Sequence, residues 1–220
     1  MEFVEPLRTQ EELDAMNYYF KSRCERDYLL FYMGINVAFR ISDLLGLKVG
    51  DVRGRDKVRR REMKTGKLRE MVILPKLKRA LEEYCADKED EEYLFKSTRY
   101  KKSNRPITRT QAYRILKAGA KECGIKNIGT HSFRKTFGYH FYKESKDVVT
   151  LMKLFNHHDP SITLRYIGIE RDEMSKAVKK WGGLWPHFKN KIWYVTIKGK
   201  ITSYKLRYIQ DVGSSKVWGY

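Results

Sequence analysis

The sequence predicts an α+β fold that is mainly α-helical and carries one small antiparallel β-sheet. A capping box at Thr9 and Glu12, followed by apolar residues at helical spacing, is typical of a helix start. Between residues 52 and 74, an Arg/Lys-dense stretch, a Thr65-Gly66 turn signal and the run MVIL favour two paired strands. A chain of 220 residues can bury one sizeable core and a small appendage.

The remaining elements follow from apolar spacing, caps and stops. We expect Thr130 and Asp147 each to cap a helix. We expect Gly124 and Asn156 to end helices, since both tolerate the left-handed conformation that a helix stop often adopts. Residues 185–220 alternate apolar and polar around Gly199 and predict a β-hairpin. Helices are expected near 9–20, 28–39, 75–85, 108–123, 130–141, 147–155, 160–166 and 170–181.

The charge balance favours a polyanionic partner. The chain carries 46 Lys and Arg against 27 Asp and Glu, a formal net charge of +19. Such an excess repels itself, and nucleic acid is the usual compensating partner. We expect no membrane contact, because no apolar run approaches the length of a membrane span and no basic amphipathic helix stands out. Three widely spaced cysteines without a Cys-x-x-Cys motif indicate a reducing cytosol.

Two polar clusters are candidates for a single phosphate site. In HSFRKT, His131 and Arg134 lie about 60° apart on one helix face. In NHHDPSITLRY, Tyr166 follows His157 by nine residues. Alone, the His-x-x-Arg pair would more often be incidental polar residues of a capped helix. The adjoining arc of the same helix carries Phe133, Phe137 and Phe141, which can be buried while the polar pair faces a cleft.

Five segments, in the same order, resemble the catalytic domain of the tyrosine recombinases, the phage-integrase and Xer-type family. They are FRISDLLGL, MKTGK, HSFRKT, LFNHHD and TLRYIG. The resemblance covers about residues 6–182 and implies the fold of that catalytic domain. It also implies a catalytic set with the family's order and spacing, namely Arg40, Asp43, Lys64, His131, Arg134, His157 and Tyr166.

The chemistry that the resemblance implies is cleavage of a DNA strand by a tyrosine, without a metal ion. The guanidinium groups of Arg40 and Arg134 would stabilise negative charge on the non-bridging phosphate oxygens. Tyr166 would attack the phosphate and form a covalent 3′-phosphotyrosine, which preserves the energy of the broken bond for rejoining. Because tyrosine is a weak nucleophile at neutral pH, a base is needed beside it.

Four further roles complete this expectation. His131 would act as the base, and His157 would donate a hydrogen bond to the phosphate. Lys64, on a mobile hairpin, would protonate the departing 5′-oxygen. It competes for this role with Lys67, and is preferred because it precedes the turn and lies at the family's distance from the first arginine. Asp43 would pair with and orient the neighbouring basic groups.

The stretch around the predicted hairpin is expected to follow DNA phosphates. Between residues 52 and 79 there are twelve Lys and Arg against three Asp and Glu, although a charge run is usually a solvated face. The expected DNA-binding residues are Arg59, Arg60, Arg61, Lys67 and Arg69. No metal is expected at the His157-His158-Asp159 run, since adjacent ligands on a tight turn cannot easily close a site. Asp159 is expected to cap a helix.

We therefore expect a tyrosine recombinase catalytic domain at residues 1–184 and a basic β-like tail at 185–220. The N-terminal core-binding domain that the family usually carries is expected to be absent. The expected function is site-specific DNA recombination or integration on double-stranded DNA, by a homo-tetramer that needs no cofactor, in the cytoplasm with the nucleoid. A type IB topoisomerase and a non-catalytic DNA-binding regulator of the same fold remain alternatives.

Overall fold

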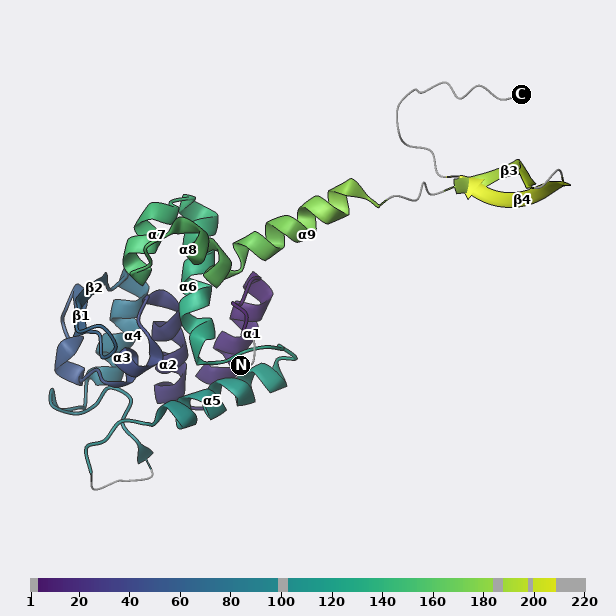
Figure 1. Cartoon of the computed structure of the whole chain (residues 1–220). Coiled ribbons are helices and arrows are strands. Elements are labelled where there is room, and N and C mark those ends of the chain that lie inside the picture. The colour runs from purple at the N-terminus through teal and green to yellow at the C-terminus, as the bar shows by residue number, and fades with distance from the viewer. Residues whose placement is uncertain (1–3, 99–102, 184–187, 198–199, 209–220) are drawn as a thin grey trace. The chain divides into compact units, whose positions relative to one another are not determined.

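A computed structural model describes residues 4–98, 103–183, 188–197 and 200–208 (Figure 1). The packing divides the chain into two units, Met1–Arg171 and Asp172–Tyr220. In chain order the elements are α1 (Gln10–Lys21), α2 (Glu25–Asn36), α3 (Ile41–Leu45), the 3₁₀ helix η1 (Val49–Asp51), β1 (Lys57–Arg61), β2 (Leu68–Val72), α4 (Pro75–Cys85), α5 (Arg109–Glu122), α6 (Thr130–Ser145), α7 (Val148–Phe155), α8 (Pro160–Ile167), α9 (Ile169–Trp181), β3 (Phe188–Ile197) and β4 (Lys200–Tyr208). The expected α+β class, mainly helical with a small antiparallel sheet, is confirmed.

The helix starts follow local capping chemistry. Thr9 and Glu12 form the predicted capping box, in which the Thr9 hydroxyl accepts from the Glu12 N–H at 3.2 Å. Asp147 and Asp159 cap α7 and α8 as expected. For α6 the cap expected at Thr130 is wrong by one residue, because Gly129 occupies the cap position. The hydroxyl of Ser132 accepts from the Gly129 N–H at 3.1 Å. This bond caps the helix at Gly129, so residue 130 is the first helical residue.

Helix ends depend on positive φ angles at two predicted stops. Gly124 has φ of 67° and Asn156 has φ of 55°, so both predictions are confirmed. The end of α2 differs from the expectation, since the helix stops at Asn36 rather than continuing to Phe39. The chain turns extended at Val37, which frees the carbonyl group of Ala38 for a contact with a distant arginine.

The predicted hairpin is present. β1 and β2 are antiparallel, with Lys57 opposite Val72 and Arg61 opposite Leu68. The backbone of Glu62 closes the turn, because its N–H donates to the Lys67 carbonyl group at 2.9 Å. One face of the hairpin is solvent-exposed and the other packs inward, as expected for strands whose side chains alternate between two faces.

The main core surrounds α2, which packs against α1, α4 and α6 (Figure 1). Leu30 and Met33 on α2 are completely buried. Gly34 allows α6 to approach closely, because a Cβ atom there would lie only 2.6 Å from the ring of Phe133. The packing thus fixes the register of α6, which carries the predicted His-x-x-Arg motif, against the central helix.

A second core lies where α6 meets α7 and α8. Its buried residues are Ala38, Tyr139, Leu151, Phe155, Ile167 and Ile169. The three phenylalanines of α6 were expected on one buried side, but they divide between the two cores. Phe133 packs against Phe31 of the main core, with ring centres 6.1 Å apart. Phe137 packs against Phe155 of the second core, with ring centres 6.4 Å apart.

The second unit contains the remainder of α9 and the predicted C-terminal hairpin. β3 and β4 pair antiparallel in a sheet of their own, which confirms the hairpin. Residues 198 and 199, where its turn was expected, lie outside the described residues. The expected domain boundary after residue 184 stays a prediction, because residues 184–187 also lie outside them and the packing divides the chain within α9. Among the described helices, none is long and apolar enough to span a membrane.

Candidate functional site

Arg134, on α6, is fixed where three segments meet. It is 4% exposed. Its Nη1 donates to the Ala38 carbonyl group at 2.8 Å and its Nη2 to the Phe155 carbonyl group at 2.9 Å. Its guanidinium carbon lies 4.6 Å from the centre of the Phe155 ring. Burial lowers the pKa of Arg134 to about 10, so the group stays charged at neutral pH. The remaining N–H donors are available for an anion.

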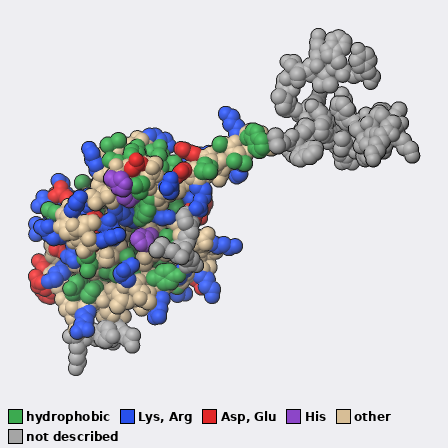
Figure 2. Space-filling view, in the orientation of Figure 1, with side chains coloured by type: hydrophobic (Ala, Val, Ile, Leu, Met, Phe, Trp, Pro, Cys, Tyr) green, Lys and Arg blue, Asp and Glu red, His purple; other side chains and the backbone are tan. Residues whose placement is uncertain are grey.

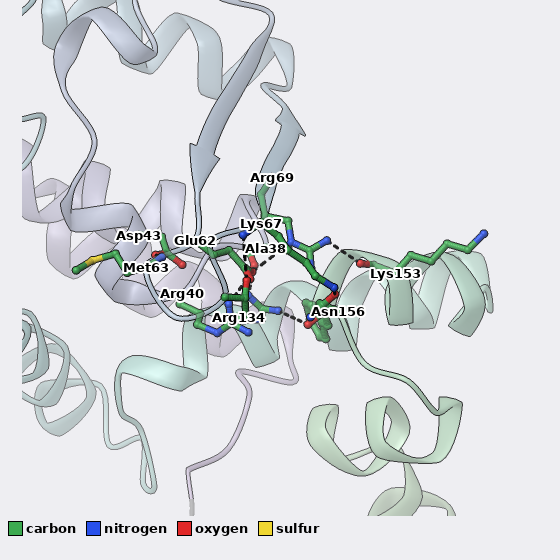
Figure 3. A network of polar contacts seen from close by, with 12 residues as sticks. Ala38, Arg40, Asp43, Glu62, Met63, Lys67, Arg69, Arg134, Lys153 and Asn156 are labelled. Atoms are coloured by element: carbon green, nitrogen blue, oxygen red, sulfur yellow. Dashed lines mark hydrogen bonds and ion pairs between the residues drawn. The ribbon is translucent and has the colours of Figure 1, made fainter.

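Arg40, the residue before α3, lies beside Arg134 (Figure 3). Its Nη1 forms an ion pair with Oε1 of Glu62 at 2.6 Å. Burial would raise the pKa of Glu62, but hydrogen bonds and the charges of Arg40 and Arg69 outweigh burial and lower it to about 2. The carboxylate is therefore ionised throughout the neutral range and holds Arg40 by charge.

Asp43 makes a different contact from the one expected. Its carboxylate is 1% exposed and accepts from the backbone N–H of Met63 at 2.9 Å. Among the described residues, no ion pair joins Asp43 to a basic side chain, and Glu62 is the acid that pairs with Arg40. Asp43 thus supports the backbone at the end of β1 rather than a guanidinium group (Figure 3).

His157 and Tyr166 lie together on the second core. Nδ1 of His157 is hydrogen-bonded to the hydroxyl of Thr163 at 2.9 Å. Thr163, on α8, is completely buried. The rings of His157 and Tyr166 also each pack edge-on against Phe155, at 5.5 Å between centres. The short loop between α7 and α8 therefore brings the two predicted catalytic residues to one place.

Tyr166 is half-buried on α8 among positive charges. Burial raises the pKa of its hydroxyl, while Arg134 and Arg40 act in the opposite direction. The ammonium group of Lys135 lies 5.4 Å from the centre of the Tyr166 ring and donates to the Val4 carbonyl group at 2.7 Å. The phenol is thus protonated at neutral pH and close to two guanidinium groups that would stabilise its anion.

His131, in the first turn of α6, is exposed. Desolvation and the charges of Arg109, Lys135, Arg134 and Arg40 lower the pKa of its imidazole. Desolvation and the two arginines of the site also lower the pKa of His157. Both imidazole groups are therefore neutral at pH 7, the form in which a histidine can accept a proton.

Lys64 and Lys67 occupy the exposed turn of the hairpin, and their side chains differ in contacts. Nζ of Lys67 donates to Oδ1 of Asn156 at 3.1 Å, beside the loop that carries His157 (Figure 3). The ammonium group of Lys64 makes no hydrogen bond or ion pair with any described residue. The structure thus places Lys64 on a turn next to Glu62 without bringing it into the group formed by the other predicted residues.

The exposed face of the hairpin holds two of the five residues expected to bind DNA. Arg59 pairs with Glu70 at 2.5 Å, and Arg61 donates to the Gly66 carbonyl group at 2.8 Å. Lys and Arg side chains outnumber Asp and Glu on the face of the larger unit seen in Figure 2. This face can therefore meet a polyanion.

Arg60 and Arg69 point the other way, toward the protein. The guanidinium group of Arg60 lies against Gly46 at the end of α3. Arg69 pairs with Glu62 at 3.2 Å and donates to the Lys153 carbonyl group of α7 at 3.0 Å. Both are among the five residues that the sequence predicts to bind DNA, but their positions on the inward face of the strands give them contacts within the protein. Their contact with DNA stays a prediction.

Three residues of the site were not found from the sequence. Glu62 had a weak signal, an acid two residues before Lys64 within a basic run. Thr163 and Lys135 had none beyond their proximity to Tyr166 and Arg134. The assembled site thus offers two charged guanidinium groups, two neutral imidazoles and one phenol, a set suited to binding a phosphate and attacking it with oxygen.

Comparison with known proteins points to the same family that the sequence motifs resemble. Residues 6–173 match the model of the phage integrase family. The chain is 49% identical over 184 residues to the probable integrase/recombinase YoeC of Bacillus subtilis (strain 168), covering 84% of this chain and 100% of YoeC. The expectation of a tyrosine recombinase catalytic domain is therefore confirmed.

Solved structures share the fold. The crystal structure of XerA recombinase matches with a TM-score of 0.64 at 19% identity, covering 82% of this chain and 67% of XerA. XerH site-specific recombinase, bound to a palindromic difH substrate in a post-cleavage complex, matches with a TM-score of 0.63 at 18% identity. That match covers 81% of this chain but only 54% of XerH, so the chain spans about half of that relative. The chain belongs to the phage integrase family, the tyrosine-type DNA recombinases.

Proposed function

We propose that this chain acts in site-specific DNA recombination, cleaving and rejoining strands through a 3′-phosphotyrosyl intermediate on Tyr166. One observation carries the proposal: Arg134 is fixed by two carbonyl groups next to Arg40, and both charges act on the Tyr166 hydroxyl. A weak nucleophile and two phosphate-binding cations in one place are what phosphodiester cleavage requires.

The proposed steps use the side chains named above in these roles. The Tyr166 oxygen attacks the phosphorus atom, its proton passes to His131, and the bond from phosphorus to the 5′-oxygen breaks. Lys64 supplies the proton that the departing 5′-oxygen takes up. A 5′-hydroxyl group of the same or another strand then attacks the phosphotyrosine and releases Tyr166. Bond energy is kept at every step, so the reaction needs no ATP.

In this proposal, side chains of the protein rather than a metal ion stabilise the negative charge that develops on the phosphate. Arg40 and Arg134 would each hold non-bridging oxygens of the phosphate, and His157 would donate a hydrogen bond through Nε2. The hydrogen bond from Thr163 to Nδ1 supports this role, since it leaves Nε2 as the ring nitrogen for the phosphate. Guanidinium groups remain charged in a half-buried site, which suits them to this work.

The proposed partner is double-stranded DNA, and the proposed assembly on DNA is a homo-tetramer. The net charge of +19 and the basic exposed face of the hairpin support binding to DNA. XerH, which shares the fold, was solved with its difH substrate. We further propose that residues 1–184 act as the catalytic domain and residues 185–220 as a basic extension.

Covalent trapping tests the proposal. The protein is incubated with a library of nicked DNA duplexes, in which the short strand released on cleavage diffuses away, and covalent adducts are isolated and sequenced. We expect adducts at a defined site, formed equally well in EDTA. Tyr166→Phe should bind DNA as before but form no adduct, because only the attacking oxygen is removed. Tyr18→Phe, at a tyrosine that is 78% exposed, is the matched control and should react normally.

The outcomes separate the alternatives. Adducts that still form with Tyr166→Phe would show that another residue is the nucleophile. Relaxation of supercoiled DNA with adducts spread over all sequences would indicate a topoisomerase. DNA binding without adducts in the unaltered protein would indicate a regulator that does not cleave.

A further inference from the structure

Glu62 is a buried carboxylate with more contacts than any role so far requires. It lies directly after β1 and is 3% exposed. Its Oε1 forms ion pairs with Nη1 of Arg40 at 2.6 Å and Nε of Arg69 at 3.2 Å. Its Oε2 accepts a hydrogen bond from the hydroxyl of Thr65. One carboxylate therefore joins the chain before α3, strand β2 and the turn of the hairpin (Figure 3).

The backbone of Glu62 also holds the turn. Its N–H donates to the Lys67 carbonyl group at 2.9 Å, and its carbonyl group accepts from the Gly66 N–H at 2.8 Å. With the bond to Thr65, three of the residues that flank Lys64 are tied to Glu62. The position of the turn is thus linked through one residue to the position of Arg40.

A buried carboxylate is stable here only because of its cationic partners. Taking a carboxylate out of water is unfavourable unless opposite charges and hydrogen bonds compensate. Arg40 and Arg69 provide that compensation, and Arg69 is itself held by the Lys153 carbonyl group of α7. Moving Arg40 away would leave the carboxylate poorly paired, so the ion pair resists displacement before DNA binds.

We propose that Glu62 is a positioning residue for strand cleavage, which holds the guanidinium group of Arg40 and the turn that carries Lys64 in one fixed relation. This inference rests on the proposed function, because it concerns the geometry of that same site. Glu62 engages one edge of the Arg40 guanidinium group, which leaves other N–H donors for a phosphate oxygen. The phosphate clamp and the proton donor are thereby placed by a single carboxylate.

The same hairpin offers a matched control. Glu70 also pairs with two cations, Lys57 at 2.7 Å and Arg59 at 2.5 Å. Its side chain is 36% exposed and lies on the outward face, away from Arg40. Glu70→Gln removes the same charge from the same hairpin without touching the site, so it reports any effect of overall charge.

The experiment compares cleavage rate with DNA affinity in the full chain. Under single-turnover conditions with protein in excess, Glu62→Gln should slow adduct formation about 10²-fold, the scale expected for a misplaced catalytic group. Its Kd for the same DNA should stay equal or become lower, because the substitution removes a negative charge and makes the protein more cationic. Glu70→Gln should cleave at the rate of the unaltered protein. A purely structural lesion would instead weaken both binding and cleavage.

A second substrate tests the link to the turn. In DNA whose 5′-bridging oxygen is replaced by sulfur, the leaving group needs no proton. With this substrate the Glu62→Gln defect should shrink but not disappear, since the misplaced Arg40 still slows the reaction. Complete rescue, or none, would show that Glu62 does not serve both groups.

Other results would overturn the inference in recognisable ways. Faster cleavage by Glu62→Gln would mean that the carboxylate competes with the phosphate for Arg40. An unchanged rate in Glu62→Gln, with normal cleavage by the unaltered protein, would remove the positioning role and leave the proposed function intact. Absence of adducts in the unaltered protein would remove the proposed function and this inference with it.

Discussion

The rings of His157 and Tyr166 meet edge to face, with 5.5 Å between their centres and 76° between their planes. Phe155 packs edge to face against both rings, and its carbonyl group accepts a hydrogen bond from Arg134. One buried phenylalanine thus supports three of the proposed catalytic side chains. The orientation of His157 depends in addition on Thr163, which binds its Nδ1.

Removing that hydroxyl group should impair cleavage through His157. Thr163→Val keeps the shape of the buried side chain but leaves Nδ1 without its partner. Because a net hydrogen bond contributes about 1 kcal/mol, we expect adduct formation to slow roughly 5- to 10-fold. Thr163→Ser, which keeps the hydroxyl group, should recover most of the rate. Equal rates for the valine and serine variants in single-turnover cleavage would contradict this role.

The pH dependence of cleavage should reflect two neutral histidines. The pKa values of His131 and His157 are lowered from 6.5, so both residues stay unprotonated below the pH at which a free histidine becomes charged. The rate of adduct formation should therefore hold its plateau through pH 6.5 and decline only in more acidic solution. A decline centred above pH 6.5 would contradict the assignment of His131 as the base.

The same shifts predict how stability changes with pH. The unfolded chain takes up protons on these histidines near pH 6.5, whereas the folded chain resists protonation until the pH is lower. The folded state thus binds fewer protons in this window, and the free energy of unfolding should fall as the pH drops below 6.5. Urea unfolding at several pH values measures this change. The His131→Gln/His157→Gln variant should lose less stability over the same range.

Gly138 should be intolerant of a side chain. A Cβ atom there would lie 2.6 Å from Cζ of Phe155 and 2.7 Å from Cγ2 of Ile167. Gly138→Ala should therefore lower the free energy of unfolding by about 1–3 kcal/mol and slow cleavage, since Phe155 supports the site. Glu144→Ala, at an exposed position of the same helix, should change stability by less than about 0.5 kcal/mol in urea unfolding.

Local chemistry explains which parts of the fold could be predicted. The caps at Thr9 and Asp159 and the stop at Asn156 depend on a few neighbouring residues, so their sequence signals were sufficient. The early end of α2 leaves the Ala38 carbonyl group to accept from Arg134, 96 residues away, and no local pattern contains such a contact. The split of the α6 phenylalanines between two cores likewise required knowledge of what packs on each side.

The site shows the same division. The spacing from His157 to Tyr166 lies within a single loop and helix, and the structure brings these residues together as expected. The partner of Arg40 could not be read from spacing, because Asp43 and Glu62 are both acids close to it in sequence or space. Burial and the direction of the strand decide between them: Asp43 accepts from a backbone N–H, while Glu62 faces the guanidinium group.

DNA affinity should fall strongly as the salt concentration rises, and the phosphate contacts of residues 52–79 should set how steeply it falls. Six to ten phosphate contacts would reduce affinity about 10³–10⁵-fold between 50 and 200 mM salt. Among the described residues, five of the twelve cations of residues 52–79 already pair with acids, namely Arg53, Lys57, Arg59, Arg69 and Lys78. We therefore expect a loss of affinity at the lower end of this range, about 10³-fold. Fluorescence anisotropy measures this, and affinity that barely responds to salt would contradict a phosphate-based interface.

Lys64 should act as the general acid, and a sulfur leaving group distinguishes it from Lys67. Lys64→Ala should slow cleavage on the order of 10²–10⁴-fold, because the departing 5′-oxygen then lacks its proton donor. DNA with sulfur at the 5′-bridging position should restore most of that rate, yet should do little for Arg134→Ala, whose charge stabilises the transition state itself. Lys67 is tied to Asn156, so Lys67→Ala should lose much less. Rescue of Lys67→Ala in place of Lys64→Ala would exchange their roles, and rescue of neither would place the general acid elsewhere.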